Sequence, residues 1–258
     1  MALYDQIGIG YDTTRRADPY ILSRLLHHLA PVKNRLYLDV GCGTGNYTAG
    51  LGAAGVRIAG IDLSRTMLAR AREKCPVLGL QNARAEALPF KTGSFAGATC
   101  IFVHHHMEDP LAAFREVHRV LQPDSRLVLF NSTVEQMRHC WLREYFPNSM
   151  AQAAASIERY EARDVLAAAN FVVRTTEPYV VRDDLRDWFL LCGKNRPKLY
   201  LDPEVRAGIS MFAGARDQTE IERGVEKLRN DIGSGRIAEV QRKYAWDGGD
   251  YMFTVALR

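Results

Sequence analysis

The stretch Arg35–Gly50, which reads RLYLDVGCGTGNYTAG, decides the fold. An apolar strand pattern at Leu36–Val40 runs directly into glycines at alternate positions, Gly41, Gly43 and Gly45. Glycine permits positive φ and leaves no side chain between the backbone and a ligand. The spacing is G-x-G-x-G and not the dinucleotide fingerprint G-x-G-x-x-G, so the glycines alone fit either a flexible turn or a ligand-binding surface.

A second feature favours the ligand. The next strand pattern, VRIAGID, ends in Asp62, about 20 residues after the turn, where an acidic side chain meets ribose hydroxyls in doubly wound folds. A carboxylate accepts charge-assisted hydrogen bonds from both vicinal hydroxyls. Neither feature outweighs a plain structural role by itself, but together they predict a nucleoside-containing ligand at the carboxyl ends of the first strands.

Strand and helix patterns alternate over the first 180 residues, which predicts βαβ units and a mostly parallel sheet. Strand patterns lie at Leu36–Val40, Arg57–Ile61, Val77–Leu80, Ala96–Val103, Arg126–Phe130, Phe171–Thr175 and the C-terminal GDYMFTVALR. Helical patterns lie at Tyr47–Ala54, Arg65–Lys74 (with Ser64 as N-cap), Pro110–Leu121 and Arg163–Ala169.

Two regions break the alternation. Ser132–Ser156 is polar and aromatic, and Arg182–Tyr244 has the pattern of several helices. In the second region we expect helices at DDLRDWFLLC, PEVRAGISMF and QTEIERGVEKLRNDI, the last ended by the glycines of GSG. Because this region lies between two strands of the sheet, it is predicted to form a lid over one edge.

Composition is that of an ordinary globular protein and excludes several classes. The chain has 258 residues, of which 47% are hydrophobic, and its net charge of +4 is spread over scattered basic residues, so we expect no nucleic-acid partner. Five dispersed cysteines indicate free thiols. The N-terminus has no secretory signal pattern and no 18-residue apolar run is present, so we expect a cytoplasmic protein without a membrane partner.

Four motifs occur in order: LDVGCGTG, GIDLSRTML, AEALPFKTGSF and HHHMEDP. Between Tyr11 and about Phe130 the chain resembles the class I S-adenosylmethionine-dependent methyltransferases, above all the ubiquinone/menaquinone-biosynthesis and trans-aconitate branch. The resemblance implies an α/β, Rossmann-like, doubly wound sheet of seven mostly parallel strands, with helices on both faces and the helical lid before the C-terminal strand. It implies cap helices at 1–30, a cofactor-binding core at 31–181 plus 248–258, and a lid at 182–247.

The resemblance also implies a cofactor site for S-adenosylmethionine, with S-adenosylhomocysteine as product. The glycine turn with Asp39 would hold the methionine moiety, Asp62 the ribose, and Arg15 the cofactor carboxylate. The full set of implied cofactor residues is Tyr11, Arg15, Asp39, Gly41, Cys42, Gly43, Gly45, Asp62, Leu63, Met67, Ala85, Glu86, Ile101 and Phe102. Arg84 is a departure from the family, which often has an aspartate at this position. Arginine has only hydrogen-bond donors, so it cannot accept a hydrogen bond from the adenine amino group.

Three consecutive histidines, His104–His106, admit several interpretations. Side chains of neighbouring residues in a strand alternate between faces, so convergence on one metal ion is disfavoured and no metal is predicted. His105 or His106 could act as a general base on an acceptor hydroxyl, since imidazole suits that role near neutral pH. The simpler interpretation, that the histidines only close the strand and cap the next helix, is favoured.

For the acceptor, the aromatic residues of the two irregular regions are the candidates for a pocket: Trp141, Tyr145, Phe146 and Trp188. The predicted function is methyl transfer to a small molecule by a monomer or homodimer. The alternatives are an RNA or protein methyltransferase and a non-catalytic cofactor-binding protein. A nicotinamide-dependent oxidoreductase is disfavoured by the glycine spacing.

Overall fold

The computed structural model describes residues 10–75, 79–159, 161–215 and 217–258. One seven-stranded sheet lies at its centre, with the strand order β3-β2-β1-β4-β5-β7-β6. The strands are β1 Leu36–Val40, β2 Arg57–Asp62, β3 Gly79–Asn82, β4 Phe95–Ile101, β5 Leu121–Asn131, β6 Val172–Tyr179 and β7 Tyr251–Leu257. The first five in this order pair in parallel, and β7 runs antiparallel to both β5 and β6.

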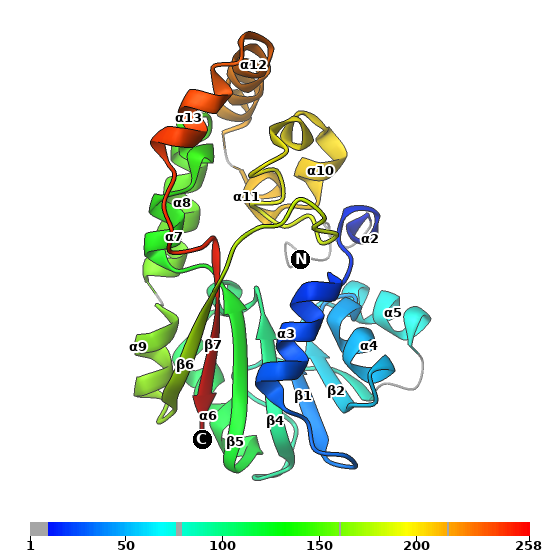
Figure 1. Ribbon diagram of the computed structural model, residues 1–258. Helices are drawn as coiled ribbons and strands as arrows, with labels where there is room; N and C mark the ends of the chain where they lie inside the picture. The colour runs from blue at the N-terminus through cyan, green and yellow to red at the C-terminus, as the bar shows by residue number, and fades with distance from the viewer. Residues whose placement is uncertain (1–9, 76–78, 160, 216) are drawn as a thin grey trace.

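Helices cover both faces of the sheet and also stand beyond one edge (Figure 1). The α-helices are α2 Tyr11–Thr14, α3 Pro19–Leu29, α4 Asn46–Ala53, α5 Arg65–Lys74, α6 Pro110–Val120, α7 Val134–Arg138, α8 Pro147–Glu158, α9 Ala162–Ala168, α10 Pro203–Ala207, α11 Ser210–Ala213, α12 Gln218–Ser234 and α13 Ile237–Lys243. Short 3₁₀ helices are η1 His104–His106, η2 Trp141–Glu144 and η3 Pro197–Leu201. The predicted fold class is thereby confirmed.

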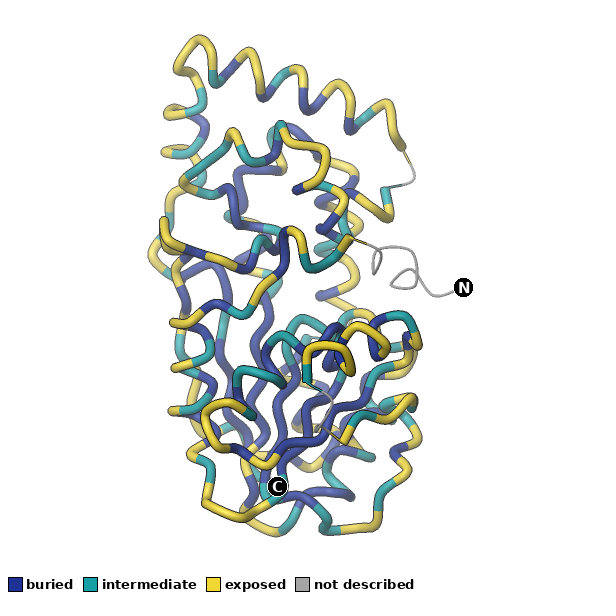
Figure 2. The backbone as a smooth tube through the Cα atoms, turned by 90° about the vertical axis from the view of Figure 1, so that its right-hand side faces the viewer, coloured by how far each residue is buried: buried dark blue, intermediate teal, exposed yellow. Residues whose placement is uncertain are grey.

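Alternation along the central strands supplies a core on each face of the sheet. In β5, Leu127 and Leu129 join the core under α6 and α9, whereas Val128 and Phe130 join the core under α3 and α4. The sheet is accordingly buried through its middle, while the outer helices keep exposed sides (Figure 2). Among the residues described, no helix combines the length and the apolar character needed to cross a bilayer.

Local signals in the sequence place most element boundaries. Helix α5 has the predicted bounds, because the Ser64 hydroxyl accepts a hydrogen bond from the Met67 N–H at 3.2 Å and caps its first turn. Helix α12 ends at Gly235, whose φ of +81° lies in the left-handed region that glycine adopts at low cost. The predicted strand at Val77–Leu80 is observed as β3 from Gly79, and residues 77 and 78 lie outside the described residues.

The region between β6 and β7 differs from the prediction in two segments. PEVRAGISMF, predicted as one helix, forms two short helices, α10 and α11, with Gly208 and Ile209 between them. DDLRDWFLLC, residues 183–192, forms turns and no helix. Its backbone N–H groups bond to other parts of the chain: Arg186 N–H to the Asp18 carboxylate at 3.0 Å, and Trp188 N–H to the Thr14 carbonyl at 3.0 Å. These tertiary partners replace the i→i−4 bonds that a helix would use.

The upper part of the molecule is assembled from both irregular regions. Helices α7 and α8, from the segment after β5, pack against each other and against elements from the segment between β6 and β7. The buried residues of both segments belong to the same core cluster as Phe130 and Phe253 of the sheet. The predicted lid therefore shares one hydrophobic core with the sheet beneath it. Helices α7 and α8 contribute to the same core as the inserted helices of the predicted lid.

Candidate functional site

The glycine turn after β1 has the backbone conformation that the spacing predicts. Gly41, Gly43 and Gly45 have φ values of +72°, +55° and +76°. A Cβ on Gly41 would lie 2.4 Å from a Val103 methyl, whereas a Cβ on Gly43 would have no protein atom within 4 Å. Gly41 is therefore needed for packing, and Gly43 leaves open space that a ligand can approach closely.

Asp62, at the end of β2, lies directly beside this turn. One carboxylate oxygen accepts a hydrogen bond from the Gly43 N–H and the other from the Ser64 N–H, each at 2.8 Å. These two bonds fix the orientation of the carboxylate beside the turn, and an ionised carboxylate can accept charge-assisted hydrogen bonds from ribose hydroxyls. Asp62 thus has the position and the chemistry that the sequence predicts for a ribose-binding residue.

Asp39, at the end of β1, is buried and already has two hydroxyl partners. Its carboxylate accepts hydrogen bonds from Thr48 Oγ1 at 2.6 Å and Thr99 Oγ1 at 2.8 Å, which connect β1 to α4 and β4. Burial raises the pKa of the Asp39 carboxyl, and the two hydroxyl donors oppose that rise. In this structure Asp39 holds the turn in place, and it also contributes to the cavity wall.

A cavity of about 630 Å³ extends from the glycine turn, within the range of ordinary ligand sites. Of the residues that the resemblance assigns to the cofactor, all but Gly45 line it: Tyr11, Arg15, Asp39, Gly41, Cys42, Gly43, Asp62, Leu63, Met67, Ala85, Glu86, Ile101 and Phe102. A Cβ on Gly45 would lie 3.0 Å from the Cβ of Ala71, so the third glycine allows α4 and α5 to pack closely. The structure therefore brings together residues that are distant in the sequence.

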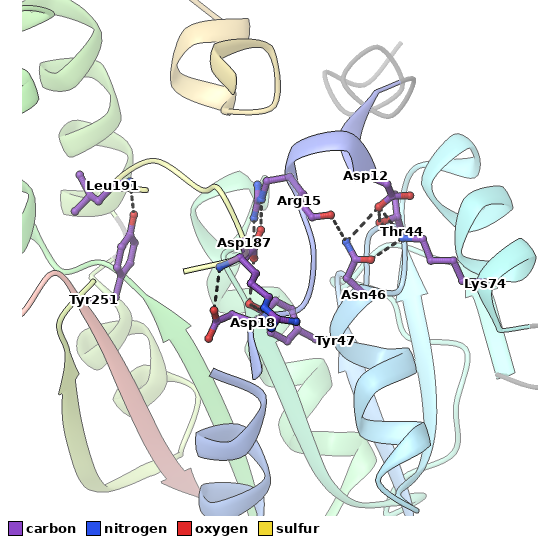
Figure 3. Close-up of polar contacts among 11 residues, drawn as sticks. Asp12, Arg15, Asp18, Thr44, Asn46, Tyr47, Lys74, Asp187, Leu191 and Tyr251 are labelled. Atoms are coloured by element: carbon purple, nitrogen blue, oxygen red, sulfur yellow. Dashed lines mark hydrogen bonds and ion pairs between the residues drawn. The ribbon is translucent and has the colours of Figure 1, made fainter. Parts of the chain in front are cut away.

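The described segment at 11–15 contributes Tyr11 and Arg15 to the cavity wall and is held by two polar clusters (Figure 3). In the first cluster, Asp12 Oδ1 accepts hydrogen bonds from Thr44 Oγ1 at 2.7 Å and from Lys74 Nζ at 2.6 Å. Asn46, the first residue of α4, joins this cluster through Lys74 at 2.6 Å. These contacts fasten α2 to the glycine turn from outside.

The second cluster is centred on a buried ion pair between Arg15 and Asp187. The Tyr47 hydroxyl donates to the same Asp187 carboxylate at 3.1 Å, and burial raises the pKa of Tyr47 well above its usual value. The Arg15 guanidinium also stacks over the Tyr11 ring, 4.8 Å from its centroid. Arg15 contributes to the cavity wall with its charge balanced, and Asp187, which the sequence analysis missed, is the residue that balances it.

The histidines after β4 form the short helix η1. His104 is buried, whereas His105 and His106 line the cavity. Desolvation lowers the pKa of His105 well below 6.5 and that of His106 to about 4, and the neighbouring histidine charges add to both effects. Within the described part of the chain, His105 Nδ1 is buried and has no hydrogen-bond partner. Both cavity-lining rings are neutral near pH 7 and can therefore accept a proton.

Phe102 has a backbone conformation that the sequence analysis did not foresee. Its φ of +56° lies in the left-handed region, which costs a bulky residue on the order of 1–2 kcal/mol. Its ring packs against Phe189 at 4.7 Å and Tyr251 at 5.2 Å between centroids. All three rings line the cavity, so this strained residue, directly after β4, adds an aromatic group to the part of the cavity wall that we call its floor.

Arg84 lines the cavity and is paired with acidic neighbours. It forms ion pairs with Glu108 and with Glu86, the latter at 3.6 Å. Its charge is thus balanced by side chains of the same wall. The Arg84 side chain supplies no acceptor for an adenine amino group, in agreement with its chemistry.

The four aromatic residues predicted to line an acceptor pocket are placed elsewhere. Trp141, Tyr145 and Phe146 are buried in the upper core, where the Trp141 indole donates to the Lys194 carbonyl at 3.2 Å and the Tyr145 hydroxyl donates to Asp231 at 2.9 Å. Trp188 is half-buried and also lies outside the cavity wall. The structure therefore does not support this part of the prediction, because these rings fill the space between upper helices.

Other residues form the wall opposite the glycine turn. They come from the segment after β5, from the segment between β6 and β7, and from the first residue of β7: Ser132, Met137, Ser149, Gln152, Ala153, Ser156, Ile157, Phe189, Leu190, Ile209, Ser210, Met211, Gly214 and Tyr251. Five of them lie on α8 at a spacing of three or four residues, which is one face of a helix. The spacing is visible in the sequence, but small and polar residues carry no signal that distinguishes a cavity wall from a solvent-facing side.

The strand order and the cavity define a class of protein. The sheet is parallel except for β7, which is inserted next to the edge strand β6, and a nucleoside-type site lies at the carboxyl ends of β1 and β2. These two features define a doubly wound α/β protein that binds its ligand where the strand order reverses. The methyltransferase-domain family matches residues 38–129 of the chain. An O-methyltransferase of Pyrenophora dematioidea is 30% identical over 191 residues, which cover 70% of this chain and 69% of that protein.

A ubiquinone/menaquinone biosynthesis C-methyltransferase of Geotalea uraniireducens is 29% identical over 150 residues, and the alignment spans 52% of this chain and 63% of that relative's length. A protein of Anabaena variabilis, solved as a methyltransferase from an antibiotic biosynthesis pathway, has 28% identity and a TM-score of 0.82, with 95% of this chain and 99% of that chain covered. The chain belongs to the class I S-adenosylmethionine-dependent methyltransferases.

The residues of this chain fit the cofactor that the family implies. The Asp62 carboxylate is an acceptor of the kind that ribose hydroxyls bind, and the open space at Gly43 allows backbone and ligand to approach. Leu63 and Met67 provide apolar flanks for a base on the same wall. The groups that line this side of the cavity are therefore those that a nucleoside linked to an amino acid requires.

Proposed function

We propose that the protein transfers a methyl group from S-adenosylmethionine to a small-molecule acceptor that binds in the upper half of the cavity. The observation that carries the proposal is the continuity of the cavity from the glycine turn to the opposite wall. The acceptor would lie between Phe102 on the floor and α8 above. Residues 10–30, the described part of the cap predicted at 1–30, would cover the cofactor, and the segment at 182–247 together with α7 and α8 would enclose the acceptor.

When bound, the cofactor supplies an electrophilic methyl group on a sulfonium, which becomes a neutral thioether as the acceptor atom takes the methyl. The protein's main contribution is orientation, which can supply about 7–11 kcal/mol of the barrier without an acid or base. Asp62 and the glycine turn would fix one reactant, and the upper wall the other. The buried Arg15–Asp187 pair holds the two halves of the cavity together.

Proton removal is the second contribution. An acceptor hydroxyl loses its proton as the new bond to carbon forms. His105 or His106 would accept it, because both rings line the cavity and are neutral near pH 7. A pKa of about 4 makes His106 a weak base. Its role would therefore be to orient the acceptor hydroxyl by a hydrogen bond and to receive the proton late in the transfer.

A transfer screen tests the proposal. The purified protein is incubated with tritiated-methyl S-adenosylmethionine and pooled small molecules, and mass spectrometry identifies any acceptor that gains one methyl group. Methylation of a small molecule that Phe102→Ala strongly reduces supports the proposal. Label recovered in RNA or protein and not in small molecules, or tight cofactor binding with no transfer to any acceptor, contradicts it.

A further inference from the structure

We infer that the acceptor is an uncharged molecule with an apolar body, and that the cavity-facing side of α8 selects it. The inference rests on the proposed methyl transfer, since it specifies the second substrate of the same site. It comes from the unequal distribution of charge around the cavity. No charged group of the described chain lies on the wall where the acceptor would bind.

In the described chain, the charged side chains of the cavity wall lie on the cofactor side, which includes the buried Asp39, or in the polar cluster of Arg15 and Asp187. Asp62 is beside the glycine turn, Arg84 is paired with Glu86 and Glu108, and Asp187 is paired with Arg15. Each of these charges is already held by a partner or by backbone N–H groups. The opposite wall, as far as the chain is described, contains no arginine or lysine that could pair with an acidic acceptor.

The opposite wall has a different composition. Among its described residues the polar groups are hydroxyls and one carboxamide, and the remainder are aliphatic, thioether and aromatic side chains. The one titratable member is the Tyr251 phenol, which is buried, has its pKa raised well above 10, and donates to no carboxylate; its oxygen accepts a hydrogen bond from the Leu191 N–H at 3.1 Å. Tyr251 is therefore neutral across the physiological range.

Helix α8 supplies the face that meets the acceptor. On the side that faces the cavity, its polar residues are Ser149, Gln152 and Ser156, and its apolar residues are Ala153 and Ile157. The Ser149 hydroxyl donates to Glu220 at 2.6 Å, and the Ser156 hydroxyl donates to the Gln152 carbonyl at 3.1 Å. The Gln152 carboxamide, which can both donate and accept, is then the polar group of α8 best suited to a neutral acceptor.

The same face lies next to the histidines, because α8 packs against η1. An acceptor on α8 would therefore be within the part of the cavity that His105 and His106 line. A carboxylate or an ammonium group brought from water to this wall would lose part of its hydration and meet no counter-charge among the described residues of the wall, which disfavours an ion relative to a neutral group of the same size. A neutral hydroxyl, carbonyl or amide can be satisfied there by the groups present.

A binding experiment with matched acid and amide pairs tests the inference. The probes are 4-hydroxybenzoate with its amide, 4-hydroxycinnamate with its amide, and 6-hydroxy-2-naphthoate with its amide, each pair nearly equal in size and different in charge. Their affinities for the protein loaded with S-adenosylhomocysteine are measured by calorimetry at pH 7.5. For the best-binding pair we expect the amide to bind about tenfold tighter than the acid, or 1.4 kcal/mol.

Two arginine substitutions on α8 test whether the preference for the amide over the acid depends on the cavity-facing side of this helix. Gln152→Arg places a cation on the wall at an exposed position, so it should shift the amide-to-acid ratio toward the acid by about fivefold or more, near 1 kcal/mol. Ala155→Arg adds the same charge to the same helix at an exposed residue outside the cavity wall, and should leave the ratio unchanged. Both variants should keep the wild-type affinity for S-adenosylhomocysteine.

The inference is overturned if the acids bind as tightly as the amides, if the two arginine variants shift the ratio equally, or if none of the uncharged probes binds. Methyl transfer is scored separately with the tritiated cofactor. A charge preference that is present and moves with Gln152→Arg, in the absence of any transfer, would contradict the proposed function and still support an uncharged ligand on α8.

Discussion

Replacement of Gly43 by alanine should separate cofactor binding from folding. The residue has a φ of +55°, so an alanine there pays the left-handed strain of roughly 1–2 kcal/mol, partly offset by about 0.4–1 kcal/mol from the lower entropy of the unfolded chain. The net loss in free energy of unfolding should be about 1 kcal/mol. The added methyl meets no protein atom within 4 Å, so it has room in the folded protein.

The cost to the ligand is larger. The methyl group would project into the cavity at the point where the backbone and the cofactor approach each other. Forcing one additional carbon into a close-packed contact typically costs about 1–3 kcal/mol, which corresponds to a Kd increased by roughly 5- to 150-fold. Calorimetric titration with S-adenosylhomocysteine measures this directly, because the product binds the same site without reacting.

Gly93→Ala is the matched control. Gly93 has a φ of +70°, a Cβ on it would also have no atom within 4 Å, and it lies outside the cavity wall. It should lose similar stability in urea unfolding and retain wild-type affinity. A folded Gly43→Ala protein with an affinity within about twofold of the wild type would refute the assignment of this turn to the cofactor.

Three further changes test other parts of the site. Asp62→Ala should weaken S-adenosylhomocysteine binding by roughly 1.5–3 kcal/mol, the usual range for hydrogen bonds to a charged group, and an unchanged calorimetric Kd would remove Asp62 from the ribose site. Because the pKa of His106 is about 4 in the folded protein and about 6.5 in the unfolded chain, its contribution to the free energy of unfolding should be constant above about pH 6.5 and decline as the pH falls toward 4. His106→Gln should make that decline smaller in urea titrations at pH 7 and pH 5, and an equal decline would contradict the assigned pKa. Asp187→Ala should lower the free energy of unfolding by about 3–5 kcal/mol, because it removes a carboxylate partner of the buried Arg15 charge, and a loss below about 1 kcal/mol would show that the pair does not hold the segments together.

The fold followed from local patterns that tertiary contacts reinforced. The strand at Leu36–Val40 and the helix at Arg65–Lys74 have the bounds predicted from apolar runs and an N-cap. The glycine turn was recognisable because its three alternate positions have positive φ, which few residues other than glycine adopt at low cost. Asp62 was recognisable because the end of β2 must lie beside the end of β1 in a parallel sheet.

Segment 183–192 shows where local pattern was insufficient. Its apolar spacing predicts a helix, but its backbone donors bond to Asp18, Thr14 and the Tyr251 hydroxyl, which are distant in the sequence. The aromatic residues around Trp141 show the same limit, because a large ring is equally suited to a core and to a pocket. Only the packing of the upper helices assigns them to the core.

The sequence by itself determined the sheet, the glycine turn and the acidic residue beside it, since each depends on neighbours along the chain or on a fixed strand register. The tertiary structure alone decided the acceptor wall and the partner of Arg15. The wall brings α8 together with residues from segments as far along the chain as Tyr251, and Arg15 meets Asp187 across 172 positions of sequence. Such contacts depend on how separate elements pack in space, and residue type carries little information about that packing for small and polar side chains.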